Sequence, residues 1–181
     1  MPTTTVAIVS GEALTQDFEE IFREHYQLVY RTAYSVTGSR QDAEDVLQTI
    51  FLRLLQREVP PDFRKSPKAY LYRAAVNLSL NTVRSRKRQN VAGDVECLEA
   101  PAPSAESSTD GQMQRSLVDA IAQLKPRAVE ILILRYEHNY SDAEIAKMLG
   151  KSRGTIAVTL YRTRGRLKKL LRASSTEGEK V

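Results

Sequence analysis

Apolar residues along the chain are spaced as in amphipathic helices, with hydrophobic positions recurring every three or four residues. In the first such stretch Phe18, Ile21 and Leu28 fall on one stripe, and residues 15–89 contain no alternating pattern typical of strands. The pattern therefore predicts an all-α fold. In the first half of the chain it predicts a helix from about Thr15 to Gly38, a second helix after Ser39, and a third from Lys68 to about Gln89.

Residues 91–111 lose this period and fill with Pro, Ala, Ser and acidic residues, a composition typical of a flexible linker. Helical spacing resumes after them, with one helix before Pro126 and an almost wholly apolar helix after it. We therefore expect two small helical domains joined by a flexible linker. The predicted divisions are a flexible tail over 1–14, a first domain over 15–90, the linker over 91–111, a second domain over 112–173 and a tail over 174–181.

The second domain carries the sequence signals of a helix-turn-helix in residues 141–172. Ser141 and Glu144 have the spacing of a capping box, which satisfies the first free amides of a helix. Gly150 can adopt the left-handed conformation that ends this helix, and Ser152 is placed to cap the next one. Two helices joined by a short turn that contains glycine form the DNA-binding unit of many regulators.

The second helix of this unit has charges of one sign. Its charged residues are basic, and no acid occurs between Glu144 and Glu177, so it forgoes the ion pairs of an ordinary surface helix. Recognition helices place their N-terminal side chains on base edges while flanking cations meet phosphates. The alternative is a helical hairpin with a solvated basic face. The residues predicted to enter the groove are Arg153, Thr155, Ala157, Val158 and Thr159.

The second helix of the first domain leaves four polar side chains off its apolar stripe, namely Asp42, Glu44, Asp45 and Gln48. A metal or acid–base site is one interpretation, but di-metal bundles also need a Glu-x-x-His motif, and neither His25 nor His138 lies in one. Acids in a first turn also suit the helix dipole. We expect no metal and no catalytic residue here, but a docking surface for a basic partner. His25 is expected to be packed and hydrogen-bonded, and His138 to be a loop residue.

The third helix combines aromatic and basic residues. Tyr70, Tyr72 and Arg73 lie near its start, and Arg84, Arg86, Lys87 and Arg88 lie at its end. Rings that stack on unpaired bases, together with cations that meet phosphates, are typical of single-stranded nucleic-acid binding. The alternatives are that the tyrosines pack in a half-buried position and that the basic end is a solvated helix terminus.

Composition excludes several other classes of protein. The chain has 181 residues, a net charge of +5 and a single cysteine, Cys97, so neither an internal disulfide framework nor a cysteine-rich zinc site is possible. No apolar run approaches the roughly 20 residues that span a bilayer, and the N-terminus has no basic region of a secretory signal. We expect a cytoplasmic protein with no membrane insertion and a polyanionic partner.

Three segments together resemble one family along nearly the whole chain. DAEDVLQTIFLRL (42–54) resembles the core-polymerase-binding helix of extracytoplasmic-function (ECF) sigma factors of the sigma-70 family. SPKAYLYRAAVNLSLNTVRSRKR (66–88) resembles their helix that melts promoters and reads the −10 element, and residues 124–171 resemble their −35-reading domain. The order and spacing of all three are specific to this family.

The resemblance implies no catalytic site, no cofactor, and binding to promoter DNA and to the β′ and β subunits of core RNA polymerase. It also implies an anti-sigma factor or a membrane signalling protein as a further partner. The implied polymerase-binding residues are the four acidic-helix residues above. The implied −10 residues are Tyr70, Tyr72, Arg73, Asn77, Arg84, Arg86 and Arg88, and the implied −35 residues are Ser152, Arg153, Thr155, Ala157, Val158, Thr159, Tyr161, Arg162 and Arg164.

The chain departs from the family pattern at several positions. Thr49 stands where an acid is usual, and Tyr70 where tryptophan is frequent. Arg153, Ala157 and Thr159 replace the usual Glu, Lys and Arg of the recognition helix, so an average −35 sequence is not expected. Two rival functions are a stand-alone helix-turn-helix regulator, for which residues 15–89 lack a receiver pattern, and a nucleic-acid-processing enzyme, which lacks a ligand set.

Overall fold

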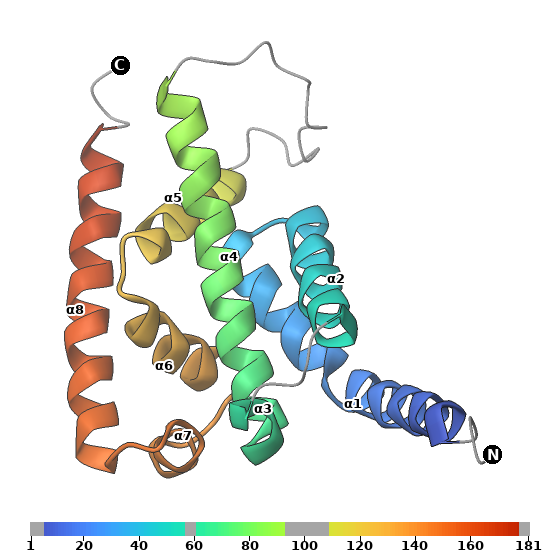
Figure 1. Ribbon diagram of the computed structural model, residues 1–181. Helices are drawn as coiled ribbons and strands as arrows, with labels where there is room; N and C mark the ends of the chain where they lie inside the picture. The colour runs from blue at the N-terminus through green and yellow to red at the C-terminus, as the bar shows by residue number, and fades with distance from the viewer. Residues whose placement is uncertain (1–5, 57–60, 93–108, 178–181) are drawn as a thin grey trace.

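The computed structural model describes residues 6–56, 61–92 and 109–177, and these ranges form eight helices and no strand (Figure 1). None of the helices in the described ranges has an apolar stretch that could cross a bilayer. The helices are α1 (Val6–Thr37), α2 (Arg40–Gln56), α3 (Pro61–Lys65), α4 (Pro67–Ala92), α5 (Thr109–Ala122), α6 (Pro126–Tyr136), α7 (Asp142–Leu149) and α8 (Arg153–Glu177).

The turn between α1 and α2 forms where the sequence predicts it. Gly38 has a φ of 66° and lets the chain leave α1 in the left-handed conformation. The Ser39 hydroxyl then accepts the Asp42 amide at 3.3 Å, which caps α2. Both predicted helix boundaries are confirmed.

The helix-turn-helix is also confirmed. Ser141 and Glu144 form the reciprocal bonds of a capping box at the start of α7, and Gly150 ends that helix with a φ of 63°. The Ser152 hydroxyl accepts the Thr155 amide at 3.2 Å, so α8 begins directly after the turn.

Two elements differ from the prediction. Helix α1 begins at Val6, ahead of the expected start near Thr15, so the predicted loose tail is helical from that residue onward. The proline-containing break before α4 includes a short helix, α3, which buries Phe63. Pro61 and Pro67 each stand at the first position of a helix, where a missing N–H costs nothing. Most of the predicted linker and Cys97 lie outside the described residues.

The first half of the chain has a core of its own. Helices α1, α2 and α4 pack together around Val29, Val46, Phe51, Leu71 and Ala75, and α3 adds Phe63. These residues are 5% exposed or less, so their apolar surface supplies most of the free energy that holds the three helices together. The predicted apolar stripes of α1 and α2 are thus confirmed.

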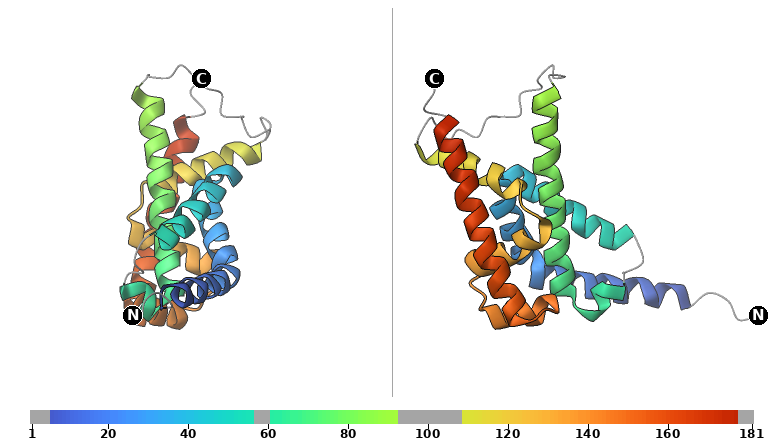
Figure 2. Two further views of the ribbon diagram at one scale, coloured as in Figure 1. Left: turned by 45° about the vertical axis from the view of Figure 1, so that its right-hand side comes forward. Right: turned by 90° about the vertical axis from the view of Figure 1, so that its left-hand side faces the viewer.

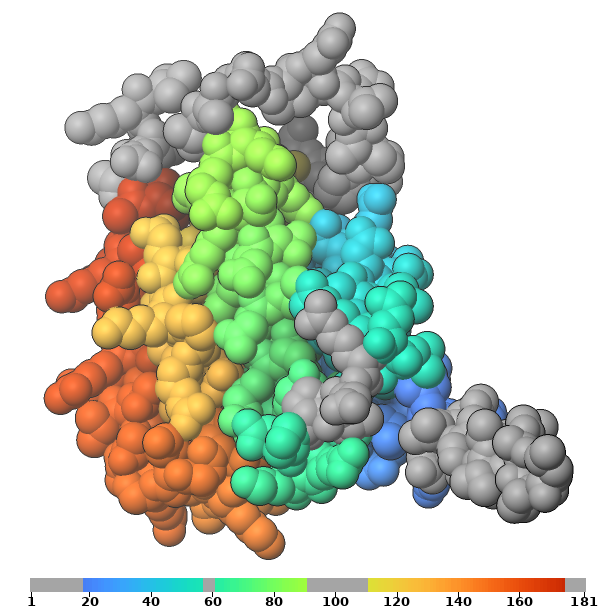
Figure 3. Space-filling model, in the orientation of Figure 1, coloured from blue at the N-terminus to red at the C-terminus, as the bar shows by residue number. Residues whose placement is uncertain are grey.

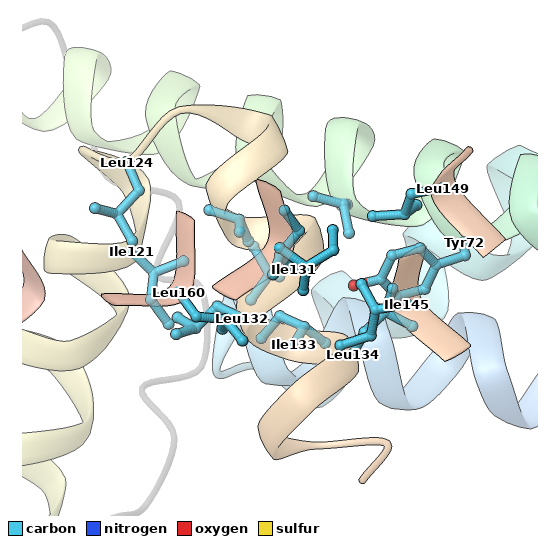
Figure 4. Close-up of a cluster of buried hydrophobic side chains, with 14 of the residues drawn as sticks. Tyr72, Ile121, Leu124, Ile131, Leu132, Ile133, Leu134, Ile145, Leu149 and Leu160 are labelled. Carbon is cyan, nitrogen blue, oxygen red and sulfur yellow. The ribbon is translucent and has the colours of Figure 1, made fainter. Parts of the chain in front are cut away.

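A second apolar cluster joins the two halves of the chain. Tyr72, Val76 and Leu80 of α4 share it with residues of α5 to α8, among them Leu134 and Ile145 (Figure 4). Helices α5 and α6 lie between α4 and α8 in the ribbon views (Figures 1 and 2). The space-filling view shows α5 and α6 in contact with one side of α4 and α2 on its other side (Figure 3). The two helical regions therefore pack as one body, an arrangement that the sequence did not predict.

The capping box at α7 gives a direct stability test. Ser141→Ala is expected to lower the free energy of unfolding by about 1 kcal/mol, because it leaves the first amides of α7 without an acceptor. Urea unfolding followed by circular dichroism measures this change. Ser85→Ala is the control, because Ser85 lies inside α4 and does not cap a helix. It should change the free energy of unfolding little. Equal unfolding midpoints for all three proteins would contradict the prediction.

Candidate nucleic-acid and polymerase interfaces

Helix α8 buries one face and exposes the other. Ile156, Leu160 and Thr163 are at most 5% exposed and pack against the neighbouring helices of the second half. Most of the residues predicted to read the −35 element lie on the opposite, exposed face, namely Arg153, Thr155, Ala157, Val158, Tyr161, Arg162 and Arg164, while Thr159 is half-buried. The buried stripe thus fixes which side chains of α8 face solvent.

The hydroxyl groups at the start of α8 bond locally, whereas its longer side chains extend outward. The Ser152 and Thr155 hydroxyl oxygens lie 2.8 Å apart, and the Thr159 hydroxyl donates to the Thr155 carbonyl at 2.7 Å. Tyr161 is 77% exposed and Val158 is 48% exposed. Large hydrophobic side chains that lie exposed side by side are typical of a surface that binds a partner. Ser152, Thr155 and Thr159 therefore stabilise the first turns, and the other predicted residues lie on the exposed face of the helix.

The exposed face of α2 carries most of the predicted docking residues. Glu44, Asp45 and Gln48 are exposed, and no ion pair joins either acid to another described residue. Leu52 and Leu55 on the same helix are 51% and 57% exposed and were not singled out from the sequence. Leu52 and Leu55 follow Gln48 by four and seven residues, so they lie on the same face of α2 as Gln48. This spacing is the sequence signal by which they could have been predicted.

Asp42 differs from the other docking candidates. Its side chain is 14% exposed and pairs with Arg86 near the end of α4. Asp42 therefore already has a basic partner within the chain, because the fold brings α4 beside the start of α2. A polymerase contact through Asp42 stays a prediction, and it would have to compete with this internal ion pair.

The two tyrosines of α4 have different environments. Tyr70 is half-buried, and the Phe63 ring meets it edge-on with centroids 5.5 Å apart. Tyr72 is 0% exposed, and its hydroxyl donates a hydrogen bond to the Glu130 carbonyl of α6. The sequence left open whether the tyrosines stack on bases or pack inside the protein, and in this conformation Tyr72 is packed inside the protein. A stacking role for either ring with DNA stays a prediction.

The other predicted −10 residues divide in the same way. Arg73 donates to the Ala69 carbonyl of its own helix at 3.1 Å, and Arg84 donates to the carbonyls of Ala122 and Leu124 at 2.9 and 2.8 Å. Asn77 and Arg88 are exposed. The structure thus places part of the predicted −10 set at the surface and part against the second half of the chain.

Burial dominates the electrostatics between the two halves. It raises the pKa of Tyr72 well above its usual value, and the nearby Glu130 carboxylate adds to this. Burial also raises the pKa of Glu130, which the Arg127 guanidinium at 3.2 Å partly offsets. Because Tyr72 stays protonated, its hydroxyl remains a hydrogen-bond donor across the neutral pH range.

The histidines do not form a metal site. His25 is 6% exposed with a pKa lowered by burial, so the prediction of a packed residue is confirmed. His138 is more than a loop residue, because its Nε2 lies 2.8 Å from the Thr32 hydroxyl and its ring meets Tyr72 edge-on. In the described ranges, no three acidic, histidine or cysteine side chains gather closely enough to hold a metal ion.

Comparison with known proteins matches each half of the chain to one family. The profile of Sigma-70 region 2 matches residues 21–89, and that of Sigma-70, region 4, matches residues 114–167. The ECF RNA polymerase sigma factor SigL of Mycobacterium tuberculosis is 31% identical over 160 residues, which cover 86% of this chain and 90% of SigL. The RNA polymerase sigma-E factor of Streptomyces antibioticus is 32% identical over 165 residues, which cover 91% of this chain and 88% of that protein.

A solved structure shares the fold. It is that of CnrH in complex with the cytosolic domain of CnrY, with a TM-score of 0.52 and 21% sequence identity over 92% of this chain and 96% of CnrH. Two family regions thus occur in order in a chain whose relatives match it almost end to end. The chain belongs to the extracytoplasmic-function group of the sigma-70 family of RNA polymerase sigma factors.

Proposed function

We propose that this protein docks on core RNA polymerase through the exposed face of α2 and directs the enzyme to promoters. In this proposal α4 opens the −10 element and the first turns of α8 read the −35 element. The observation that supports it most is the exposed face of α8, which follows a capped turn and whose charges from Arg153 to Arg172 are all basic. The protein would act in the cytoplasm without a catalytic step of its own.

The −35 contact divides along α8. Arg153 leaves the first turn directly after Ser152, where a recognition helix lies closest to base edges. Lys168 and Lys169 follow roughly 22 Å further along at about 1.5 Å per residue, too far to reach the same base step. Arg153 would therefore read sequence, and the distal lysines would meet phosphates.

Melting at the −10 element would depend on binding free energy alone. Unstacking a base costs a few kcal/mol, and stacking it on an aromatic ring returns about 1–3 kcal/mol per base. Tyr70 and Tyr72 are the rings of α4 proposed for this role. Tyr70 is half-buried and Tyr72 is buried, whereas Arg88 and Asn77 lie exposed on the same helix. The polymerase would supply the remaining contacts that hold the strands apart.

A separate protein that controls this sigma factor is also part of the proposal. CnrH was solved with the cytosolic domain of a second protein, CnrY. An anti-sigma factor or membrane signalling protein of this kind would compete with polymerase or DNA for the surfaces described above.

The reading of the −35 element can be tested with a library of promoter variants transcribed by core polymerase. Arg153→Ala is expected to relax the preference at one or two −35 positions, because a bidentate arginine–guanine pair is worth about 1–3 kcal/mol of discrimination. Lys168→Ala is the matched control. It should weaken all sequences alike and reduce the salt slope by about one unit. Identical sequence preferences for the parent and Arg153→Ala would show that Arg153 does not read bases.

A further inference from the structure

Helix α8 carries an apolar ridge along its exposed face. Val158 and Tyr161 are both exposed, and at 3.6 residues per turn they lie on one side of the helix. Gly154 and Gly165 are exposed on the same side, so that the four residues fall within about 60° of one another around the helix axis. We call these four residues the apolar ridge. The ribbon views place α8 at an outer edge of the molecule (Figures 1 and 2).

The two glycines of the ridge have no packing role within the described part of the chain. An added Cβ at Gly154 or at Gly165 would meet no atom within 4 Å. Glycine also destabilises a helix relative to alanine, because it loses more backbone freedom on folding. Close approach of a partner to the backbone of α8 explains glycine at both positions.

Arginines border the apolar ridge on both sides. Arg153 and Arg164 lie on one side of it and Arg162 and Arg166 on the other, each about 70–110° around the helix from the centre of the ridge. All four arginines are exposed. An uncharged ridge between two rows of cations is complementary to a DNA groove, whose floor of base edges lies between two phosphate backbones. The charge pattern therefore favours duplex DNA as the partner of the ridge.

The chemistry of the ridge selects one feature of the groove floor. The side chain of Val158 has no hydrogen-bond donor or acceptor, so it cannot bond to a base edge. In the major groove the apolar group that base edges present is the 5-methyl group of thymine, which apolar and aromatic side chains contact. Val158 and the ring of Tyr161 are groups of this kind, and both extend outward from α8.

We propose that Val158 and Tyr161 read thymine methyl groups, so that the preferred −35 element has A·T pairs beneath the apolar ridge. The two residues are about 4.5 Å apart along the helix axis, close to the spacing of about 3.4 Å between base pairs. Their thymines should therefore lie in neighbouring base pairs. That the DNA is a promoter rests on the proposed function, whereas thymine recognition rests on the ridge and the arginines beside it.

Deoxyuridine tests this inference one methyl group at a time, because it differs from thymidine only by lacking that group. In the promoter transcribed best by the parent protein, each thymine of the −35 element on either strand is replaced in turn. Binding of the protein together with core polymerase is measured by fluorescence anisotropy. One or two replacements should weaken binding about fourfold each, which is the value of one buried methyl group. Unchanged binding at every thymine would overturn the proposal.

Two alanine variants assign the thymines to side chains. Val158→Ala and Tyr161→Ala should each remove the effect of deoxyuridine at one position and keep it at the other, so each variant is the control for the other. Both side chains are exposed, and circular dichroism checks that the fold is kept. Arg164→Ala should weaken thymine and deoxyuridine promoters alike, because a phosphate contact does not sense the methyl group. Deoxyuridine effects that persist in both alanine variants would show that other residues read the methyl groups.

A selection without polymerase separates the inference from the proposed function. The full chain is mixed with random-sequence duplexes made either with thymine or with deoxyuridine throughout, and the bound duplexes are sequenced. Thymine should be enriched at one or two fixed positions in the first pool, and deoxyuridine should not be enriched in the second. If this enrichment occurs but the protein does not bind core polymerase, thymine recognition stands and the proposed function fails. If polymerase is directed to the promoter but neither experiment shows an effect of the methyl group, the proposed function stands and the inference fails.

Discussion

Asp45→Arg is expected to weaken binding to core RNA polymerase by at least about tenfold, because a reversed charge opposite a basic partner surface is repelled. Asp45 is exposed on α2 and has no ion pair with another described residue, so its removal should leave the fold intact. Gln48→Arg on the same face should act in the same direction. Fluorescence anisotropy with purified core enzyme measures the affinity, and circular dichroism checks the fold.

The matched control for α2 is a charge reversal elsewhere in the first half. Asp62→Arg lies in the first turn of α3 and is exposed, so it changes net charge by the same amount as Asp45→Arg. It should bind polymerase nearly as well as the parent. Unchanged affinity for Asp45→Arg and Gln48→Arg, with normal spectra, would count against α2 as the docking helix.

The tyrosines of α4 should have their largest effect after docking, when promoter DNA melts. Tyr70→Ala and Tyr72→Ala are each expected to lower open-complex formation, by roughly 5- to 150-fold for a ring that stacks on a base at about 1–3 kcal/mol. Binding to closed promoter DNA should change much less, because no base is unstacked in that step. Permanganate footprinting separates the two steps.

Tyr72→Phe separates the role of the Tyr72 ring from that of its hydroxyl group. It keeps the ring but removes the hydrogen bond to the Glu130 carbonyl, so it should melt DNA at least as fast as the parent. Tyr72→Ala would lose the ring and also leave a cavity in the apolar cluster that joins the two halves of the chain. Parent melting rates for both alanine variants would show that the rings are structural, and slow melting by Tyr72→Phe would show that the hydroxyl itself is needed.

The local structure of this protein could be predicted because its signals are short in sequence. Ser141 with Glu144 specifies a helix start, and Gly150 specifies its end, whatever surrounds them. The apolar stripes of α1, α2 and α8 were predictable for the same reason, since the helical period reports which side is buried. The length of helix α1 was underestimated, because the residues before Thr15 show no regular hydrophobic period although they are helical from Val6.

The packing of the two halves could not be predicted from the same patterns. Tyr72, Val76 and Leu80 form a stripe that fits a core in either half, and periodicity does not say which helix covers it. Contacts such as Tyr72–Glu130 and Thr32–His138 join residues 58 and 106 positions apart, beyond the reach of local signals. His138 was therefore predicted as a loop residue, and the ion pair of Asp42 with Arg86 was not predicted.

The candidate sites were predicted by two routes. The exposed, basic face of α8 followed from residue types and capping, and the structure places most of it at the surface. The roles of α2 and α4 came largely from resemblance to the family, which the comparisons confirm for the chain as a whole. The individual contacts of Asp45, Tyr70 and Arg153 stay predictions.

Run-off transcription tests the central claim most directly. The purified protein is mixed with core RNA polymerase and a linear DNA that carries a promoter to which this protein binds in cells. The lengths of the transcripts are then measured. The account predicts a transcript of one defined length that appears only when protein and core enzyme are both present. A specific protein–DNA complex without polymerase, together with no defined transcript, would contradict it and favour a stand-alone regulator.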